Sequence, residues 1–157
     1  MEQNKYKILI VDDEPDVIEI VKRSLTRNEF SFVSAQDGLS AFETALKEIP
    51  DLIILDWNLP LMSGIEVLKN LKGNSSTQKI PVIIATGIMT NSSNLKTALE
   101  AGASDFIRKP ADPVELYSRV KSVLSLAEEH KKTLLLEKEI FKQKEEVLLK
   151  EIQNKEK

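Results

Sequence analysis

The chain has 157 residues, enough for one ordinary domain and an appendage, and its 41% hydrophobic and 30% charged content is that of a soluble globular protein. It has no cysteine and one histidine, His130, which excludes disulfides, thiol catalysis, zinc–thiolate sites and histidine-rich metal sites. The net charge is −3 without a basic face, no apolar run approaches the roughly 20 residues that cross a bilayer, and the N-terminus does not resemble a signal peptide, so we expect a cytoplasmic protein that binds neither nucleic acid nor membrane.

Short apolar runs alternate with amphipathic segments along the first four fifths of the chain. The apolar runs predict strands at residues 6–11, 30–35, 52–55, 81–85 and 104–107. Helical spacing predicts a helix after each run: from Pro15 to about Asn28, from Gly38 to a stop at Pro50, from Gly64, from a cap at Asn91 or Ser92 to Gly102, and from near Asp112 and Pro113. Five repeats of this β-α unit predict a doubly wound α/β fold, in which helices cover both faces of a five-stranded parallel sheet.

Acidic and polar side chains stand where the predicted strands end. Asp12 and Asp13 follow the first strand, Asp56 the third, Thr86 the fourth, and Lys109 comes just after the fifth. In an open parallel sheet these ends share one edge, and ligands bind in the crevice outside it. A lone Asp56 is more simply a helix or turn cap, but its expected neighbours favour a functional site.

Three carboxylates that share one crevice with a single amine call for a cation. Like charges a few ångströms apart raise each other's pKa unless a cation joins them. Oxygen ligands without histidine or cysteine favour Mg²⁺, with Mn²⁺ as the alternative. A carboxylate such as Asp56 can act as a nucleophile and form an aspartyl-phosphate, whose oxygens the metal, Lys109, Thr86 and backbone N–H groups would neutralise. No residue is placed to attack a second substrate, which favours a phosphoryl acceptor over a multi-turnover enzyme.

Four motifs resemble the receiver domain of bacterial two-component response regulators. They are ILIVDDEP at 8–15, LIILDWNLPLMSGIEVL at 52–68, PVIIATG at 81–87 and ALEAGASDFIRKP at 98–110. Each motif is weak alone, but together, in this order and at these spacings, they are specific, and the resemblance covers residues 6 to about 126. It implies a flavodoxin-like sheet with strand order 2-1-3-4-5.

The resemblance also implies a role for each matching residue. The implied phosphoacceptor is Asp56; the implied metal ligands are Asp12, Asp13, Asp56 and Asn58; the implied phosphate contacts are Thr86 and Lys109; the implied switch pair is Thr86 and Phe106; and Pro110 is the candidate for a cis peptide. Two positions depart from the common pattern: Trp57 stands where the family more often has Met, Val or Leu, and Phe106 replaces the commoner Tyr.

The implied function is that of a switch rather than an enzyme. A histidine kinase or phosphotransfer protein would donate a phosphoryl group to Asp56 in a Mg²⁺-dependent reaction, and the surface at residues 91–126 would then change its packing. The only chemistry expected of the chain itself is self-phosphorylation and self-dephosphorylation. The resemblance implies that the signal passes through the C-terminal helix to an output domain or a partner.

Plainer interpretations compete with this one. A Mg²⁺-dependent phosphatase could use Asp56 as its nucleophile. Such enzymes, however, carry an Asp-x-Asp motif after their first strand, and in this chain Asn58 stands at the position of the second Asp. The chain could also be a pseudo-receiver that only scaffolds protein contacts. Individually, Thr86 could be an ordinary strand-end residue, Phe106 plain core and Lys109 a solvated surface lysine, while Gly64 and Gly102 are most simply turn and cap glycines.

The last helix shows no stop signal. From Leu116 onward there is no Gly or Pro, and Glu–Lys pairs recur four residues apart. We therefore predict a receiver domain at residues 1–126 and a charged helical extension at 127–157. Leu134, Phe141 and Leu148 recur at seven, with charged positions between them, which is a weak coiled-coil pattern. A parallel homodimeric coil, a solvated single helix and a helix packed back on the domain remain open, as does dimerisation through residues 91–126. The highly charged end suggests an output domain beyond residue 157.

Overall fold

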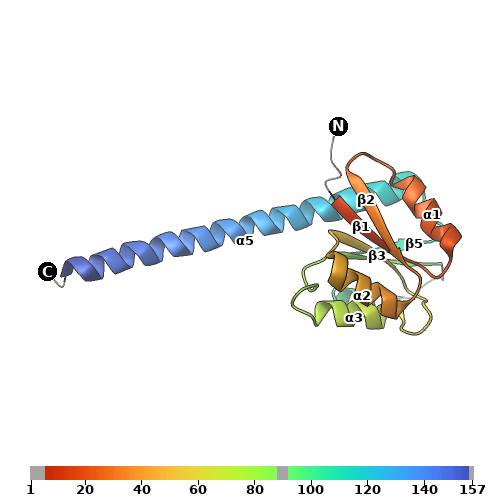
Figure 1. Cartoon of the computed structure of the whole chain (residues 1–157), viewed down its shortest axis with the longest axis horizontal. Helices are drawn as coiled ribbons and strands as arrows, with labels where there is room; N and C mark the ends of the chain where they lie inside the picture. Colours follow the sequence, from red (N-terminus) through yellow and green to blue (C-terminus); the bar gives the residue numbers. More distant parts are fainter. Residues whose placement is uncertain (1–5, 88–91, 156–157) are drawn as a thin grey trace. The chain divides into compact units, whose positions relative to one another are not determined.

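The computed structural model describes residues 6–87 and 92–155, and it divides into two compact units, Met1–Leu124 and Ser125–Lys157. In chain order the elements are β1 (Tyr6–Val11), α1 (Pro15–Ser24), β2 (Phe30–Ala35), α2 (Gly38–Glu48), β3 (Leu52–Asp56), α3 (Gly64–Lys72), β4 (Val82–Thr86), α4 (Ser92–Glu100), β5 (Asp105–Arg108) and α5 (Pro113–Lys155) (Figure 1). The alternation of strand and helix predicted from the apolar runs is confirmed.

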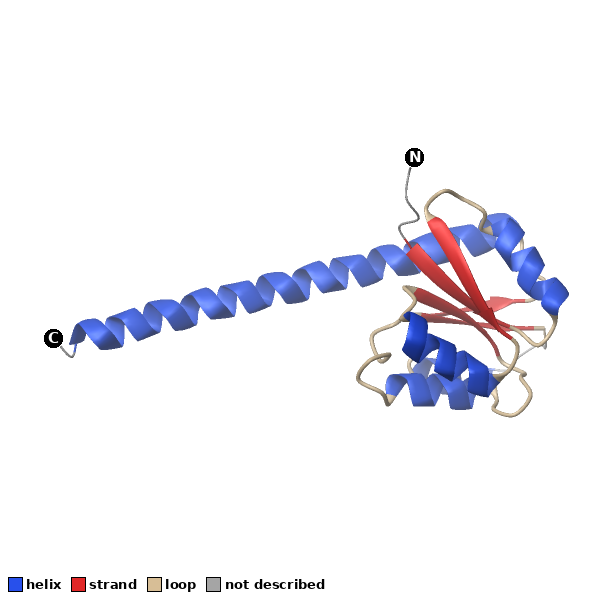
Figure 2. Ribbon diagram, viewed as in Figure 1, coloured by secondary structure: helices blue, strands red, loops and turns tan. Residues whose placement is uncertain are grey.

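The five strands form one parallel sheet in the order β2-β1-β3-β4-β5. This is the order implied by the resemblance, and the long last helix is also present. Figure 2 shows the sheet as a twisted layer between helices. In the central pairing Val11 lies opposite Leu55, and in the next pairing Asp56 lies opposite Ala85, so the carboxyl ends of β1, β3 and β4 are level with one another.

Alternate residues of the central strands face two separate cores, as expected of strands buried on both faces. Ile8 and Ile10 of β1 pack with Ile18 of α1 and with residues of α5 up to Leu124. Leu9, between them, belongs to the opposite core, to which α2, α3 and α4 contribute through residues such as Ala41, Val67, Leu68 and Ala98. The sheet is therefore held by α1 and the start of α5 on one face and by three helices on the other.

Several predicted boundaries shift. Helix α1 ends at Ser24 rather than near Asn28. The backbone N–H of Leu25 donates to the carbonyls of Val21 and Lys22, and the Thr26 hydroxyl also donates to the Lys22 carbonyl, so the last turn is closed at this point. Strand β5 begins one residue later than predicted, at Asp105. The predicted cap at Asn91 lies outside the described residues.

The second unit, as far as it is described, is the helical segment 125–155, the remainder of α5. Its apolar side chains are largely exposed, among them Leu136 at 62%, Phe141 at 70% and Leu148 at 56%. Within the described part of the chain, no helix is both long enough and apolar enough to span a membrane.

Candidate functional site

The candidate site lies at the carboxyl ends of four strands. Asp12 directly follows β1, Asp56 is the last residue of β3, Thr86 is the last residue of β4, and Lys109 directly follows β5. Asp12, Asp56 and Thr86 stand where buried apolar runs end, and the parallel pairing brings these strand ends and that of β5 together. The structure therefore gathers the residues that sequence reasoning selected from four distant segments.

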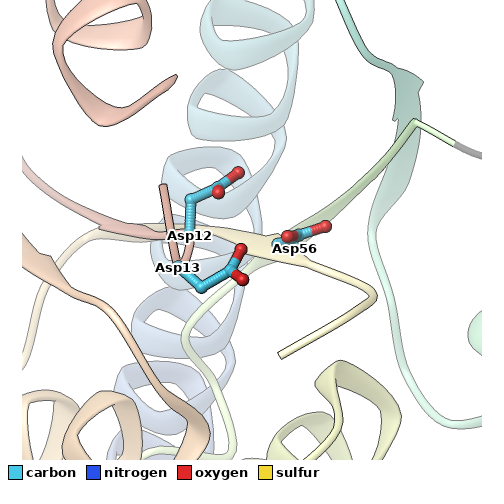
Figure 3. A group of neighbouring side chains, drawn as sticks. All are labelled: Asp12, Asp13 and Asp56. Carbon is cyan, nitrogen blue, oxygen red and sulfur yellow. The ribbon is translucent and has the colours of Figure 1, made fainter. Parts of the chain in front are cut away.

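Three carboxylates face one another in this crevice. Oxygen atoms of Asp12, Asp13 and Asp56 all lie within 4.8 Å of one another, and Figure 3 shows the three side chains converging on a shared space. Asp12 and Asp56 are almost fully buried, with 3% and 4% exposure, while Asp13 is exposed. One side of the cluster is therefore open to solvent and the other is enclosed by the sheet.

Lys109 supplies positive charge to the two buried acids. Its Nζ donates to Asp12 Oδ2 at 2.7 Å and lies 3.3 Å from Asp56 Oδ2. The Lys109 backbone is fixed as well, because its N–H donates to the Thr86 carbonyl at 2.8 Å and the peptide bond to Pro110 is cis. The interpretation of Lys109 as a solvated surface lysine is thus wrong for this structure, and the cis peptide expected at Pro110 is present.

The arrangement raises the pKa of Asp56 above its ordinary value. Burial is the largest cause and the neighbouring Asp12 charge adds to it, while the charge of Lys109 and hydrogen bonds from Lys109 and the Asn58 N–H oppose it. The Asp56 carboxyl therefore gives up its proton less readily than a solvent-exposed aspartate does. A further cation beside the carboxylate would reverse that balance.

The pKa of Lys109 moves upward as well. Burial of the ammonium lowers it, but the hydrogen bond to Asp12 and the charges of Asp56 and Asp12 outweigh that effect. Lys109 therefore remains protonated at neutral pH, and its charge is shared by two carboxylates. One amine does not neutralise three acids, so the described crevice carries excess negative charge.

The loop after Asp56 approaches the strand end closely, and this is the feature that sequence reasoning missed. The Gly64 N–H donates to the Trp57 carbonyl at 2.9 Å, and a Cβ atom at Gly64 would lie 2.3 Å from the Asp56 carbonyl oxygen. Gly64 is thus required by contact with the backbone of the candidate nucleophile, not only by a turn. Its place in the motif SG before an apolar helix gave no sign of that contact.

The remaining predicted residues occupy varied environments. Thr86 is 1% exposed at the end of β4, and Phe106 is half-buried against the core that includes α2, α3 and α4. Asn58 is exposed, and its N–H lies 3.4 Å from Asp56 Oδ1. Asp12 Oδ1 also accepts the Glu14 N–H at 3.0 Å, so one oxygen holds the backbone just before α1 while the other accepts from Lys109.

The donor set fits a hard divalent cation. Asp12, Asp13 and Asp56 offer carboxylate oxygens without nitrogen or sulfur, on the open side of a crevice that holds excess negative charge. Mg²⁺ characteristically takes one or two carboxylates, retains water and binds phosphate oxygens with the positions left over. Burial and the neighbouring Asp12 charge both raise the pKa of Asp56, and a cation at the cluster would counteract both effects.

Comparison with known proteins identifies the family. The model of the response regulator receiver domain matches residues 8–121. The chain belongs to the response regulator receiver domain family. The match contains every residue of the crevice and ends within α5.

Curated relatives agree with the family. The receiver is 42% identical over 118 residues to the phosphate regulon transcriptional regulatory protein PhoB of Escherichia coli K12, an alignment that covers 75% of this chain and 51% of PhoB. It is 37% identical over 117 residues to the response regulator PleD of Caulobacter vibrioides, which covers 74% of this chain and 26% of PleD. The chain thus spans about half the length of PhoB and less of PleD.

Solved structures show the same fold. A receiver domain protein from Methanospirillum hungatei, described as CheY-like, aligns with a TM-score of 0.73 at 27% identity, covering 80% of this chain and 98% of that one. The receiver domain of a signal transduction histidine kinase from Syntrophus aciditrophicus aligns with a TM-score of 0.69 at 38% identity, covering 76% and 90%. Receiver domains similar to this one therefore occur in proteins of different kinds, one of them a histidine kinase.

Proposed function

We propose that this receiver accepts a phosphoryl group on Asp56. The observation that carries the proposal is the convergence of Asp12, Asp13 and Asp56 within 4.8 Å, with Lys109 Nζ at 3.3 Å from Asp56. A carboxylate oxygen of Asp56 attacks phosphorus, the bond between phosphorus and the donor's leaving group breaks, and an acyl phosphate results. The donor's leaving group departs with the bonding electron pair.

Asp12, Asp13, the Asp56 side chain and the Asn58 backbone carbonyl would hold the metal, Mg²⁺ or in its place Mn²⁺. When bound, the cation supplies charge neutralisation for the carboxylates and for phosphoryl oxygens. Lys109 contacts both Asp12 and Asp56, so its ammonium is positioned to bind an oxygen of a phosphoryl group on Asp56. The Thr86 hydroxyl and the N–H groups of the β3–α3 loop complete the oxygen contacts.

Thr86 and Phe106 form the proposed switch. Thr86 lies at the end of β4 and pairs with Arg108 of β5, two residues from Phe106. Movement of Thr86 toward a phosphoryl oxygen would free space that the Phe106 ring can fill, and the 91–126 surface would change with it. This surface exposes Leu95, Leu99 and Val114 at 37%, 49% and 73%, which suits a face that contacts a partner.

The donor is proposed to be a sensor histidine kinase or a phosphotransfer protein. An apolar groove opens beside the crevice, between α1 and the segment after β5, and Asp12 and Lys109 form part of its wall. Ile20 of α1, which is 55% exposed, lines it together with Pro110 and Ala111. A donor that places a phosphohistidine over Asp56 could anchor an apolar side chain in this groove.

We propose that signalling proceeds through assembly of two chains and through an output domain C-terminal to the helix. Either the 125–155 helix or the 91–126 surface provides the homodimer contact. An output domain beyond residue 157 would receive the signal there. The protein is expected to act in the cytoplasm, where its proposed donors present their phosphohistidines.

The test is incorporation of phosphate from acetyl phosphate. Wild type should gain the mass of one phosphoryl group with Mg²⁺ present and far less with a chelator, while Asp56→Asn should gain none. The variant Asp51→Asn, with its carboxylate outside the crevice, is the matched control and should label like wild type. Equal labelling of Asp56→Asn and wild type would remove Asp56 from the role.

A second readout reports the metal without any phosphate. Trp57 is the only tryptophan of the chain and directly follows Asp56. Titration with Mg²⁺ should therefore change tryptophan fluorescence in wild type, and Asp13→Asn should weaken the apparent affinity. Identical titrations of both proteins would contradict the proposed ligand set.

A further inference from the structure

The exposed 125–155 helix carries two lines of apolar residues along its length, here called columns, that could contact a second helix. Each column has three large apolar residues. Leu134, Phe141 and Leu148 form one column at intervals of seven, and they are the residues that suggest a coiled coil from sequence. Leu136, Ile140 and Val147, exposed by 62%, 43% and 57%, form a second column with spacings of four and seven. Apolar burial does not by itself favour the second column, because its Leu, Ile and Val side chains are no larger than the Leu, Phe and Leu of the first.

Charge separates them. In a parallel pair that uses Leu134, Phe141 and Leu148, the alternating core positions are Glu137, Lys144 and Glu151, and each faces its own copy. Every heptad then opposes two like charges inside the contact, which is unfavourable. In the second column the core runs Thr133, Leu136, Ile140, Gln143 and Val147 without a charge, and like charges meet only at the flanking d positions, Glu129 and Lys150.

We infer that the helix pairs with a second copy of itself in parallel, with Ile140 and Val147 at the a positions and Leu136 at a d position of the heptad. This inference rests on the proposed homodimer and specifies its contact surface. β-branched residues at a with leucine at d favour two-stranded parallel coils. Asn154 then falls at an a position as well, where a polar residue fixes register.

The same register turns the charged residues into complementary pairs. Glu137 and Lys144 move from the core to e positions, at the edge of the contact. There Lys132 at g lies opposite Glu137 of the second copy, and Glu139 at g lies opposite its Lys144. One further pair, Glu146 with Glu151, is repulsive. Four of the six edge contacts in the symmetric dimer are therefore attractive.

The surface of the helix offers a matching receptacle. A shallow hollow is lined by Ile140, Gln143, Lys144 and Val147, at positions i, i+3, i+4 and i+7. In the inferred register these are a, d, e and the next a, which is the set of four residues that receives a d-position side chain in knobs-into-holes packing. The side chain it would receive is Gln143 of the second copy.

The experiment exploits the absence of cysteine from the chain. Val147→Cys and the one-residue shift Leu148→Cys are introduced singly into the full chain, and disulfide formation under mild oxidation is followed by non-reducing electrophoresis. A disulfide needs Cα atoms within about 7 Å. The inferred contact makes Val147→Cys form covalent dimers at least tenfold faster than Leu148→Cys.

Other results overturn the inference in distinguishable ways. Faster cross-linking of Leu148→Cys selects the other column, and equally slow reaction of both in a protein that sediments as a dimer selects an antiparallel helix or the 91–126 surface. Sedimentation of wild type as a monomer removes the proposed homodimer itself. Labelling of Asp56 by acetyl phosphate is unaffected by any of these results, so the proposed phosphoacceptor function stands or falls separately.

A charge exchange tests the partner of Lys132. Lys132→Glu should weaken the dimer by roughly fivefold, since both symmetric edge pairs become repulsive, and addition of Glu137→Lys should restore it. Lys131→Glu makes the same charge change at an outward f position and should leave the dimer constant unchanged. Equal effects of the two single variants would show that net charge, not the inferred pairing, governs association.

Discussion

The two units of this chain place their polar and apolar groups in opposite ways. In the unit up to Leu124, carboxylates of Asp12 and Asp56 are almost fully buried at the ends of apolar strands. In the described part of the second unit, large apolar side chains such as Phe141 and Leu136 remain in water. Both arrangements are unfavourable for the isolated chain.

The comparison teaches that each unit is incomplete in its own way. Buried carboxylates with too little positive charge are stabilised by a cation and by the redistribution of charge that phosphorylation brings. Exposed apolar residues on a helix are stabilised by another helix. A cation should therefore stabilise the first unit directly, and a second helix should stabilise the second unit directly.

A large loss of stability is expected when Gly64 is replaced. Gly64→Ala places a Cβ atom 2.3 Å from the Asp56 carbonyl oxygen, and the backbone of both segments must move. We expect a loss of about 3 kcal/mol in the free energy of unfolding, measured by urea denaturation. Gly73→Ala, where the nearest backbone oxygen is 3.3 Å away, should change stability by less than about 1 kcal/mol. Similar losses at both positions would contradict the close approach.

Removal of the amine in the crevice should also destabilise. Lys109→Ala leaves Asp12 and Asp56 buried without their shared cation. We expect a loss of about 2 kcal/mol in metal-free buffer, recovered in part by added Mg²⁺. Lys96→Ala, which removes an exposed lysine, serves as the control and should be neutral. An unchanged free energy of unfolding for Lys109→Ala would mean that the ion pairs of Lys109 with Asp12 and Asp56 do not stabilise the first unit.

The fold was largely predictable because its pattern is local. Apolar runs that end in Asp56 or Thr86 predict buried strands and the position of the crevice, since strand ends in a parallel sheet share one edge. The shift of the α1 end from Asn28 to Ser24 was not predictable, because it depends on hydrogen bonds of Leu25 and Thr26 that no apolar period encodes.

The site was predictable in its members but not in all its contacts. Sequence spacing selected Asp12, Asp56 and Lys109, and the family resemblance supplied their roles. The contact between Gly64 and the Asp56 backbone depends on how the loop folds back on its own strand, which composition does not reveal. The extension shows the reverse problem, since its sequence offers two contact columns and the apolar spacing alone does not distinguish them.

Replacement of the Asp56 carboxylate by a neutral group should raise stability, whereas loss of Lys109 should lower it. The pKa of Asp56 is raised on folding, so the folded state binds the proton more tightly and this group lowers stability at neutral pH. Asp56→Asn should thus stabilise the metal-free protein by about 1 kcal/mol at pH 7. The gain should shrink as pH falls through the raised pKa and vanish below the unfolded pKa, near 4. Denaturation curves in chelator at several pH values test this, and a variant less stable than wild type at pH 7 would contradict it.

The smallest effect on the first unit is expected from the helix. Ile140→Ser removes an a-position side chain that is 43% exposed in the single chain. Mg²⁺ titration and unfolding of the first unit should change by less than about 0.5 kcal/mol, while the dimer constant measured by sedimentation should weaken by about tenfold. Leu149→Ser, at an outward position, is the control. A change in Mg²⁺ affinity at Ile140→Ser would show that the two units are not independent in this respect.

The most direct measurement locates the phosphoryl group. After reaction with acetyl phosphate and Mg²⁺, borohydride reduces an acyl phosphate of aspartate to homoserine, and peptide mapping by mass spectrometry identifies the converted residue. The proposed phosphoacceptor role predicts conversion at Asp56, with Asp12 and Asp13 unchanged. Conversion at either of those neighbours, or no conversion in protein that binds Mg²⁺, would contradict it.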